Sequence, residues 1–239
     1  MNLIEELNEL INGSNNIVFF GGAGVSTESG IPDFRSVDGL YHLKYDYSPE
    51  QILSRSFFQK KPEDFYRFYY DKMIYQDAVP NITHKKLAEL EAAGKLKAVI
   101  TQNIDGLHQA AGSKNLIELH GSILKNHCTS CGAFYTLEEV LKKAPLPRCS
   151  CDGIIKPEVV LYEEPLKERN IRAAIKAISE ADLLIIGGTS LSVYPAAGFI
   201  DYYTGNKLVL INKSATPMDS KADLLLSLPL GEVMSALLV

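Results

Sequence analysis

Four cysteines form the sequence's clearest chemical pattern. They lie in two close pairs, Cys128-Thr-Ser-Cys131 and Cys149-Ser-Cys151, with 17 residues between the pairs. Two pairs at such a separation are typical of zinc sites in which four thiolates surround the ion tetrahedrally. Because four thiolates leave no position for water or substrate, we expect a structural zinc. Redox-active thiol pairs or disulfides are the alternative, which a reducing cytosol disfavours.

Polar residues also follow three separate apolar runs of the chain. Gln102-Asn103-Ile104-Asp105 follows the run ending at Thr101, and His120-Gly121 follows the run Leu116–Leu119. In an open parallel sheet, ligands bind at the carboxyl ends of the strands. Each polar end alone would be a solvated loop, but three together predict a binding site.

The third polar end is rich in glycine. Ile17 to Phe20 form an apolar run typical of a strand buried on both faces of a parallel sheet. The glycines at 21, 22 and 24 then permit a tight turn and close backbone approach to a ligand. N–H groups at a strand-to-helix turn suit a dinucleotide pyrophosphate, although a plain turn is the alternative.

The dinucleotide fingerprint is incomplete after this turn. Thr27 stands where the third glycine belongs, and Gly30-Ile31-Pro32 stops the following helix almost at once. The broken helix predicts a loop that carries Asp33, Phe34 and Arg35 back over the ligand. This arrangement disfavours a standard hydride-transfer cleft.

Strand and helix patterns alternate along the chain, which predicts an α/β fold with a doubly wound, parallel, Rossmann-like sheet. Strands are expected at Ile17–Phe20, Lys97–Thr101, Leu116–Leu119, Pro157–Glu164, Asp182–Ile186, Lys207–Ile211 and Leu224–Leu228. Helices are expected at Leu3–Ile11, His84–Gly94, Leu107–Gly112, Leu137–Lys143, Leu166–Ala181, Pro195–Gly205 and from Glu232.

A small domain should interrupt this sheet. We expect a zinc module at 127–153 and a helical insert at 39–83, leaving 1–38, 84–126 and 154–239 as the discontinuous Rossmann-like part. The insert is rich in Phe and Tyr, which predicts helices packed on one another. Alternatively, its aromatic side chains help to wall an apolar ligand channel.

Composition excludes several classes of protein. A net charge of −5 disfavours a large nucleic-acid footprint. No stretch approaches the roughly 20 apolar residues of a membrane span, and the acidic, amphipathic N-terminus does not resemble a signal peptide. With the clustered cysteines, these features predict a cytoplasmic protein.

Together these motifs resemble the sirtuins, the NAD-dependent protein lysine deacylases, and in particular their compact bacterial members. The resemblance covers about Ile17 to Asn212. It rests on Gly22-Ala23-Gly24-Val25-Ser26, Gly30 to Arg35, Thr101 to Asp105, Leu119-His120-Gly121, both cysteine pairs, Gly188-Thr189-Ser190-Leu191 and Pro195-Ala196-Ala197.

The resemblance implies NAD-dependent deacetylation of acetyl-lysine, releasing nicotinamide and O-acetyl-ADP-ribose. His120 would be the general base on a ribose hydroxyl, a role that suits an imidazole near neutral pH. Asn103 and Asp105 would position the ribose and the nicotinamide carboxamide, and Phe34 would shield the reactive carbon from water. The implied NAD-binding residues are Gly22, Ala23, Gly24, Thr27, Phe34, Arg35, Gln102, Asn103, Ile104, Asp105, His120, Thr189, Ser190, Asn212 and Lys213.

The resemblance further implies that an acetylated peptide adds as a strand between two segments. These segments comprise Val159, Val160, Leu161 and Tyr162 on one side and Ser192, Val193 and Tyr194 on the other. One departure lies beside them, because sirtuins usually carry glycine where this chain has Glu163. The added negative charge would favour basic residues around the substrate lysine.

The acyl group is predicted to be acetyl. Sirtuins that prefer succinyl-lysine carry a Tyr and an Arg three residues apart, where this chain has Tyr69 and Lys72. Because Lys lacks the fork that Arg offers a carboxylate, we expect an apolar acyl pocket. Deacetylation should then be the main activity, with longer aliphatic groups as further candidates.

Several alternatives remain open at this point. They are deacylation of longer or acidic acyl groups, NAD-dependent ADP-ribosylation of a protein, and a zinc-stabilised NAD sensor without activity. The polar trio His120, Asn103 and Asp105 argues against a binding module alone, and the interrupted helix after Thr27 argues against a dehydrogenase. The sequence does not indicate an oligomeric state.

Overall fold

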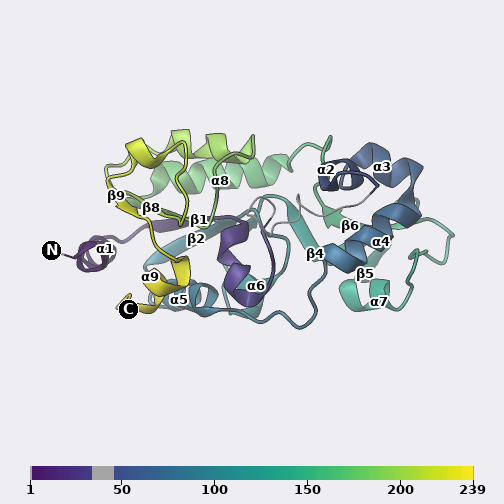
Figure 1. The fold of residues 1–239 in the computed structure, drawn as a ribbon, viewed down its shortest axis with the longest axis horizontal. Coiled ribbons are helices and arrows are strands. Elements are labelled where there is room, and N and C mark those ends of the chain that lie inside the picture. Colours follow the sequence, from purple (N-terminus) through teal and green to yellow (C-terminus); the bar gives the residue numbers. More distant parts are fainter. Residues whose placement is uncertain (1, 34–45, 239) are drawn as a thin grey trace.

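A six-stranded parallel sheet organises the larger part of the molecule (Figure 1). The computed structural model describes residues 2–33 and 46–238. The sheet order is β3-β2-β1-β7-β8-β9, and every pairing in it is parallel. The strands are β1 (Ile17–Gly21), β2 (Leu96–Thr101), β3 (Leu116–Glu118), β7 (Leu183–Gly187), β8 (Leu208–Ile211) and β9 (Leu224–Leu226).

The sheet is covered on both faces, as its apolar runs require. One face packs on α1 (Leu3–Asn12), α5 (Ile82–Ala92) and α9 (Leu230–Ser235). The other face packs on α8 (Glu168–Glu180) and on the 3-10 segment η4 (Ala196–Tyr202). The prediction of a doubly wound, Rossmann-like sheet is therefore confirmed.

A smaller unit lies at the opposite end of the molecule from the two termini (Figure 1). Its antiparallel sheet has the order β5-β4-β6. The strands are β4 (Gly121–Cys128), β5 (Phe134–Thr136) and β6 (Ile155–Val159), with α7 (Leu137–Leu141) beside them. Neither β4 nor β5 was predicted from the sequence, because β4 begins directly after a polar strand end and its residues do not alternate cleanly.

The described part of the aromatic segment, from residue 46 on, contains three short helices beside this sheet. These are α2 (Pro49–Ile52), α3 (Arg55–Lys60) and α4 (Pro62–Lys72). Phe65, Tyr66, Phe68 and Tyr69 are almost fully buried in one cluster. Tyr69 stacks on Phe65 with ring centroids 5.6 Å apart. These four side chains form a packed core, which supports the helical-cluster interpretation.

Two expected elements differ in the structure. β6 ends at Val159, and the residues beyond it make irregular contacts instead of continuing as the expected strand to Glu164. The helix expected over Pro195–Gly205 is 3-10 instead of α. Its Gly198 N–H bonds to the carbonyl of Pro195, only three residues back, in a segment whose Ala196, Ala197, Phe199 and Ile200 are buried against the sheet. The short helix α6 (Leu107–Ala110) agrees with expectation.

Candidate active site

The carboxyl ends of the parallel strands meet at one edge of the sheet. Gly21 lies opposite Thr101 on one side and Gly187 on the other. Numbered within the parallel sheet alone, the strand order is 3-2-1-4-5-6, with the reversal between β1 and β7. The crevice at such a reversal is where doubly wound sheets bind nucleotides.

The glycines of the first loop allow close packing of two chain segments. The Gly24 N–H donates to the Gly188 carbonyl at 2.8 Å. A Cβ on Gly24 would lie 2.8 Å from the Gly188 backbone, and one on Gly22 would lie 2.8 Å from the Thr189 side chain. The glycines therefore bring the loops after β1 and β7 into direct contact at the point where the strand order reverses.

The loop itself forms two 3-10 turns, η1 (Ala23–Val25) and η2 (Thr27–Ser29), in place of a helix. Gly30 ends the second turn in the left-handed conformation, with φ of 83°. The predicted interruption of the helix is confirmed. Asp33 is the last described residue before the gap, and the predicted roles of Phe34 and Arg35 fall outside the described residues.

Ser26 joins the polar residues that follow β2. Its hydroxyl donates to Asp105 Oδ2 at 2.6 Å and accepts from Asn103 Nδ2 at 3.0 Å. Ser26 is 1% exposed. The other carboxylate oxygen of Asp105 accepts from the Leu107 N–H at 2.9 Å. These bonds fix the orientation of both the amide and the carboxylate.

His120 lies beside this group, at the end of β3. Its Nδ1 lies 2.9 Å from the Gln102 carbonyl. A carbonyl only accepts, so Nδ1 carries the proton and Nε2 is the basic nitrogen. Burial lowers the pKa of His120, although the bond to Gln102 opposes this shift. The imidazole is consequently neutral at neutral pH and able to accept a proton.

Gln102 connects the carboxyl ends of β1, β2 and β7. Its Nε2 donates to Thr189 Oγ1 at 3.1 Å, and its backbone N–H donates to the Gly21 carbonyl. Ser190, Asn212 and Lys213 follow β7 and β8 at the same edge of the sheet. Asn212 Nδ2 bonds to the Ser214 carbonyl in its own turn, so its side chain is held locally.

The four cysteine sulfurs come together at the end of the small sheet. All of them lie within 4.8 Å of one another. The Sγ–Sγ distance is 3.4 Å between Cys128 and Cys151 and 3.6 Å between Cys131 and Cys149. A tetrahedral zinc with bonds of about 2.3 Å would separate its sulfurs by about 3.8 Å. Both the distances and the donor set fit zinc.

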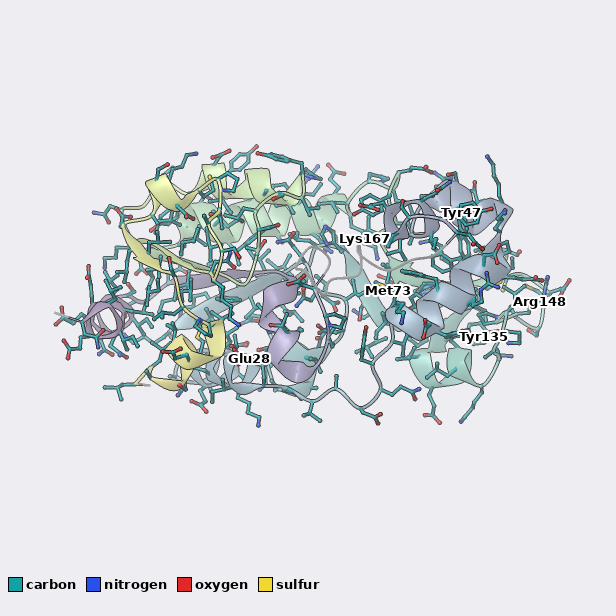
Figure 2. All side chains as sticks on the ribbon, in the orientation of Figure 1. Glu28, Tyr47, Met73, Tyr135, Arg148 and Lys167 are labelled. Atoms are coloured by element: carbon teal, nitrogen blue, oxygen red, sulfur yellow. The ribbon has the colours of Figure 1, made fainter. Side chains whose placement is uncertain are left out.

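Backbone and side-chain donors support the cysteine cluster. The N–H groups of Ser130 and Cys131 point to Cys128 Sγ at 3.4 and 3.5 Å. The Tyr135 hydroxyl donates to Cys149 Sγ at 3.0 Å, and Figure 2 shows Tyr135 at the end of the molecule occupied by the small sheet. Such donors stabilise thiolates, the form that binds metal.

The sequence matches the model of one protein family. The family model described as "Sir2 family" matches residues 22–195, well over half of the chain. The chain belongs to the Sir2 family.

Two bacterial Sir2 relatives cover nearly the whole chain. A protein of Clostridium perfringens, named NAD-dependent protein deacetylase, is 60% identical over 97% of this chain and 96% of its own length. A protein of the same name from Cutibacterium acnes is 50% identical, covering 97% of this chain and 96% of its own.

Solved Sir2 structures share the fold. A Sir2 complex with a p53 peptide and NAD+ has a TM-score of 0.87 at 42% identity, covering 98% of this chain and 96% of its own. A Sir2 complex with deacetylated p53 peptide and 3'-O-acetyl ADP ribose has a TM-score of 0.91 at 41% identity, with the same coverage.

The first of the two predicted peptide-binding segments of this Sir2 protein contacts the histidine. The Val160 N–H donates to the His120 carbonyl at 2.9 Å. In the second segment, Tyr194 is 77% exposed, and the Val193 carbonyl accepts from the Ala197 N–H. The segment after β6 is thus part of the structure that holds His120.

No separate role was predicted from the sequence for Ser26, for Asn81 or for the two buried histidines near them, His84 and His108. Asn81 caps α5, and its Nδ2 donates to the Val25 carbonyl at 2.8 Å and to Ser29 Oγ at 3.0 Å. It therefore ties the first loop to α5. The available signal for Ser26 was a hydroxyl two residues after Gly24, the last of the closely spaced glycines of the loop.

Proposed function

We propose that this chain is an NAD-dependent protein lysine deacetylase. The observation that carries the proposal is the group formed by His120, Asn103 and Asp105, which follow the carboxyl ends of β3 and β2. Membership of the Sir2 family, with relatives named deacetylases over almost the full chain, agrees with it. Bound NAD supplies the ADP-ribose that accepts the acetyl group as nicotinamide leaves.

His120 acts as the general base. Its Nδ1 is committed to the Gln102 carbonyl, which leaves Nε2 to accept a proton from a ribose hydroxyl. A neutral imidazole is required for this step, and burial, by lowering the pKa, favours the neutral form. Asn103 and Asp105, oriented by Ser26, bind the ribose and the nicotinamide carboxamide.

The remaining predicted contacts complete the proposal. The first loop and Gln102 hold the phosphates and ribose, with Gly22, Ala23, Gly24, Thr27, Phe34 and Arg35 in that loop. Thr189, Ser190, Asn212 and Lys213 hold the adenosine half. Zinc is bound by Cys128, Cys131, Cys149 and Cys151 and has a structural role, because four thiolates leave no open position.

The acyl preference is acetyl over acidic groups. Tyr69 is 1% exposed and packed among other aromatics, and Lys72 pairs with the neighbouring Asp71 at 3.2 Å. An acyl carboxylate would have to displace that pair, and Lys would grip it with a single point charge. Faster turnover of succinyl than of acetyl peptides would contradict this preference.

The division into a Rossmann-like part, a helical insert at 39–83 and a zinc module at 127–153 remains a prediction. A cytoplasmic location remains one as well. None of the described helices is long and apolar enough to cross a membrane.

The deciding experiment follows nicotinamide release with NAD and an acetyl-lysine peptide, and identifies the products by mass spectrometry. We expect peptide-dependent release of nicotinamide, together with the deacetylated peptide and O-acetyl-ADP-ribose. All three products should be lost in His120→Ala. Attachment of ADP-ribose to a protein acceptor would instead indicate an ADP-ribosyltransferase. Binding of NAD without any nicotinamide release would indicate a sensor.

A further inference from the structure

Glu163 occupies a backbone position that ordinarily favours glycine. Its φ is 73°, in the left-handed region where a Cβ is unfavourable and where Asn, Asp and Gly are the usual residues. A glutamate persists at such a position only when its surroundings hold it there. The contacts of the Glu163 side chain show which residues hold it in this conformation.

The Glu163 carboxylate accepts two hydrogen bonds from one residue of the helical insert. Oε2 accepts from the Ser56 backbone N–H, and Oε1 accepts from the Ser56 hydroxyl, each at 2.9 Å. Ser56 lies in the first turn of α3, where backbone N–H groups have no partner within the helix. The carboxylate therefore binds the start of α3 with both of its oxygens.

Main-chain bonds continue this contact on either side. The Tyr162 N–H donates to the Leu53 carbonyl, and the Arg55 N–H donates to the Tyr162 carbonyl, each at 3.0 Å. Ser54 and Tyr162 form an isolated parallel bridge. Residues 53–56 and 162–163 are thus paired along their length, although more than 100 residues of sequence separate them.

The same segment contacts the predicted general base two residues earlier. The Val160 N–H donates to the His120 carbonyl at 2.9 Å. Glu164 closes the turn from within, because its Oε2 accepts from the Leu161 N–H at 2.9 Å and from Lys156 Nζ at 3.1 Å. The two adjacent glutamates therefore have different roles, since Glu164 shapes the turn and Glu163 attaches it to α3.

We propose that Glu163 is a positioning residue for the peptide substrate: its carboxylate fixes residues 159–162 against α3, so that the edge a peptide adds to is formed in advance. A pre-formed edge lowers the ordering cost of binding, which appears in the KM for the peptide. The inference rests on the proposed deacetylase function. It differs from the expectation that Glu163 attracts basic residues of the substrate, because both carboxylate oxygens are bonded to Ser56.

The test compares steady-state kinetics of Glu163→Ala, Glu163→Gln, Ser56→Ala and the double variant Glu163→Ala/Ser56→Ala. Two acetyl-lysine peptides of equal length are used, one with Lys and one with Glu on both sides of the acetyl-lysine. Glu163→Ala should raise the KM for both peptides about five- to tenfold. The kcat and the KM for NAD should stay within about twofold of the original chain.

The other variants separate attachment from charge. Glu163→Gln keeps an oxygen acceptor without charge and should lie closer to the original chain than Glu163→Ala does. Ser56→Ala keeps its backbone N–H and should have a smaller effect, and the double variant should be no worse than Glu163→Ala. Glu168→Gln, at an exposed glutamate paired with Arg172, is the matched control and should change nothing.

Three results would overturn the proposal. The first is an unchanged peptide KM in Glu163→Ala, and the second is additive effects on the peptide KM in the double variant. The third is a rise in KM that is seen only with the Lys-flanked peptide and has the same size in Glu163→Ala and Glu163→Gln. Glu163→Gly guards against poor folding of the alanine variant, because glycine suits this φ; it should still raise the peptide KM.

Hydrogen exchange tests the attachment without activity. In Glu163→Ala, the amides of Ser56 and of residues 160–162 should exchange about tenfold faster, and unchanged exchange there would contradict the attachment. If the original chain released no nicotinamide with either peptide, the proposed function would fail, while the exchange result would still decide whether Glu163 holds the segment.

Discussion

The edge of the parallel sheet and the cysteine cluster of the small sheet hold their polar groups by different means. At the sheet edge, Ser26 and the strand ends are positioned by two large apolar clusters, one on each face of the sheet. In the small unit, the described cluster around the cysteines has four buried residues, and two of these are Cys128 and Cys149 themselves. A core of that size does not hold a module together without a further link.

We therefore expect the sheet edge to fold before it binds a ligand, and the cysteine cluster to fold only when its ligand is bound. The bonds of Ser26, Asn103 and Asp105 are complete within the chain. Four sulfurs within 4.8 Å of one another are complete only around a cation, because neighbouring thiolates repel. Removing a ligand should consequently unfold the segment around the cysteines and leave the sheet edge intact.

Removal of zinc should have the largest effect on stability. Cys149→Ser, or treatment with a chelator, should lower the metal content from about one zinc per chain to none. Structural zinc contributes on the order of 10 kcal/mol in small zinc modules. Loss of even half of that would lower the melting temperature by roughly 10–20 °C. Metal analysis with calorimetry measures this, and an unchanged melting temperature without zinc would refute a structural role.

His120→Ala should have the largest effect on catalysis with little on folding. Loss of a general base lowers kcat by about 10²- to 10⁴-fold. The apolar clusters do not include His120, so the melting temperature should change little. Nicotinamide release by the purified variant, with its far-UV circular dichroism as a control, measures both. Activity within tenfold of the original chain would assign the base elsewhere.

The two regions were predictable from the sequence only where the residues form a clear pattern, such as an apolar run or a fixed spacing of cysteines. Continuous apolar runs such as Ile17–Phe20 identified the buried strands, and the cysteine spacing identified the metal site. β4 was missed because Gly121–Cys128 mixes buried and exposed residues irregularly: it pairs with two strands, and its register with β6 shifts between Ser122 and Asn126. Tertiary pairing, which no local period reveals, decides such a strand.

The site was predicted unevenly for a related reason. His120, Asn103 and Asp105 follow recognisable strand ends. Ser26 acts through two side chains about 80 residues away in the sequence, so only the fold reveals its partners. The positive φ of Glu163 was also invisible locally, because its support comes from Ser56 in another module.

Ser26→Ala should have an intermediate effect that tests whether the sheet edge is ordered in advance. It leaves Asp105 Oδ2 and Asn103 Nδ2 without their shared partner, a cost of about 1–3 kcal/mol. We expect kcat/KM for NAD to fall about tenfold or more. Ser179→Ala, on the exposed face of α8, is the control. An effect below twofold would mean that the two side chains do not depend on Ser26.

Acid should weaken the sheet edge more gradually, through two histidines behind it. His84 and His108 are 0% and 1% exposed, with ring centroids 4.7 Å apart. Burial lowers the pKa of His84 from 6.5 to about 4 against the opposing attraction of Asp105, and lowers the pKa of His108 to about 3 with a contribution from His84. The unfolded chain therefore binds protons first as pH falls.

Stability contributed by the neutral histidines is accordingly full above pH 6.5 and is lost as pH falls from about 6.5 to between 4 and 3. The full loss is about 3 kcal/mol for His84 and about 5 kcal/mol for His108, of which about 2 kcal/mol for each ring falls between pH 7 and pH 5. Denaturant unfolding at pH 7 and pH 5 measures it, with the carboxylates as a background common to all variants. His108→Leu removes a ring whose nitrogens have no hydrogen-bond partner within the described part of the chain, and it should flatten the pH dependence. An equally steep loss in that variant would place the acid sensitivity in other groups.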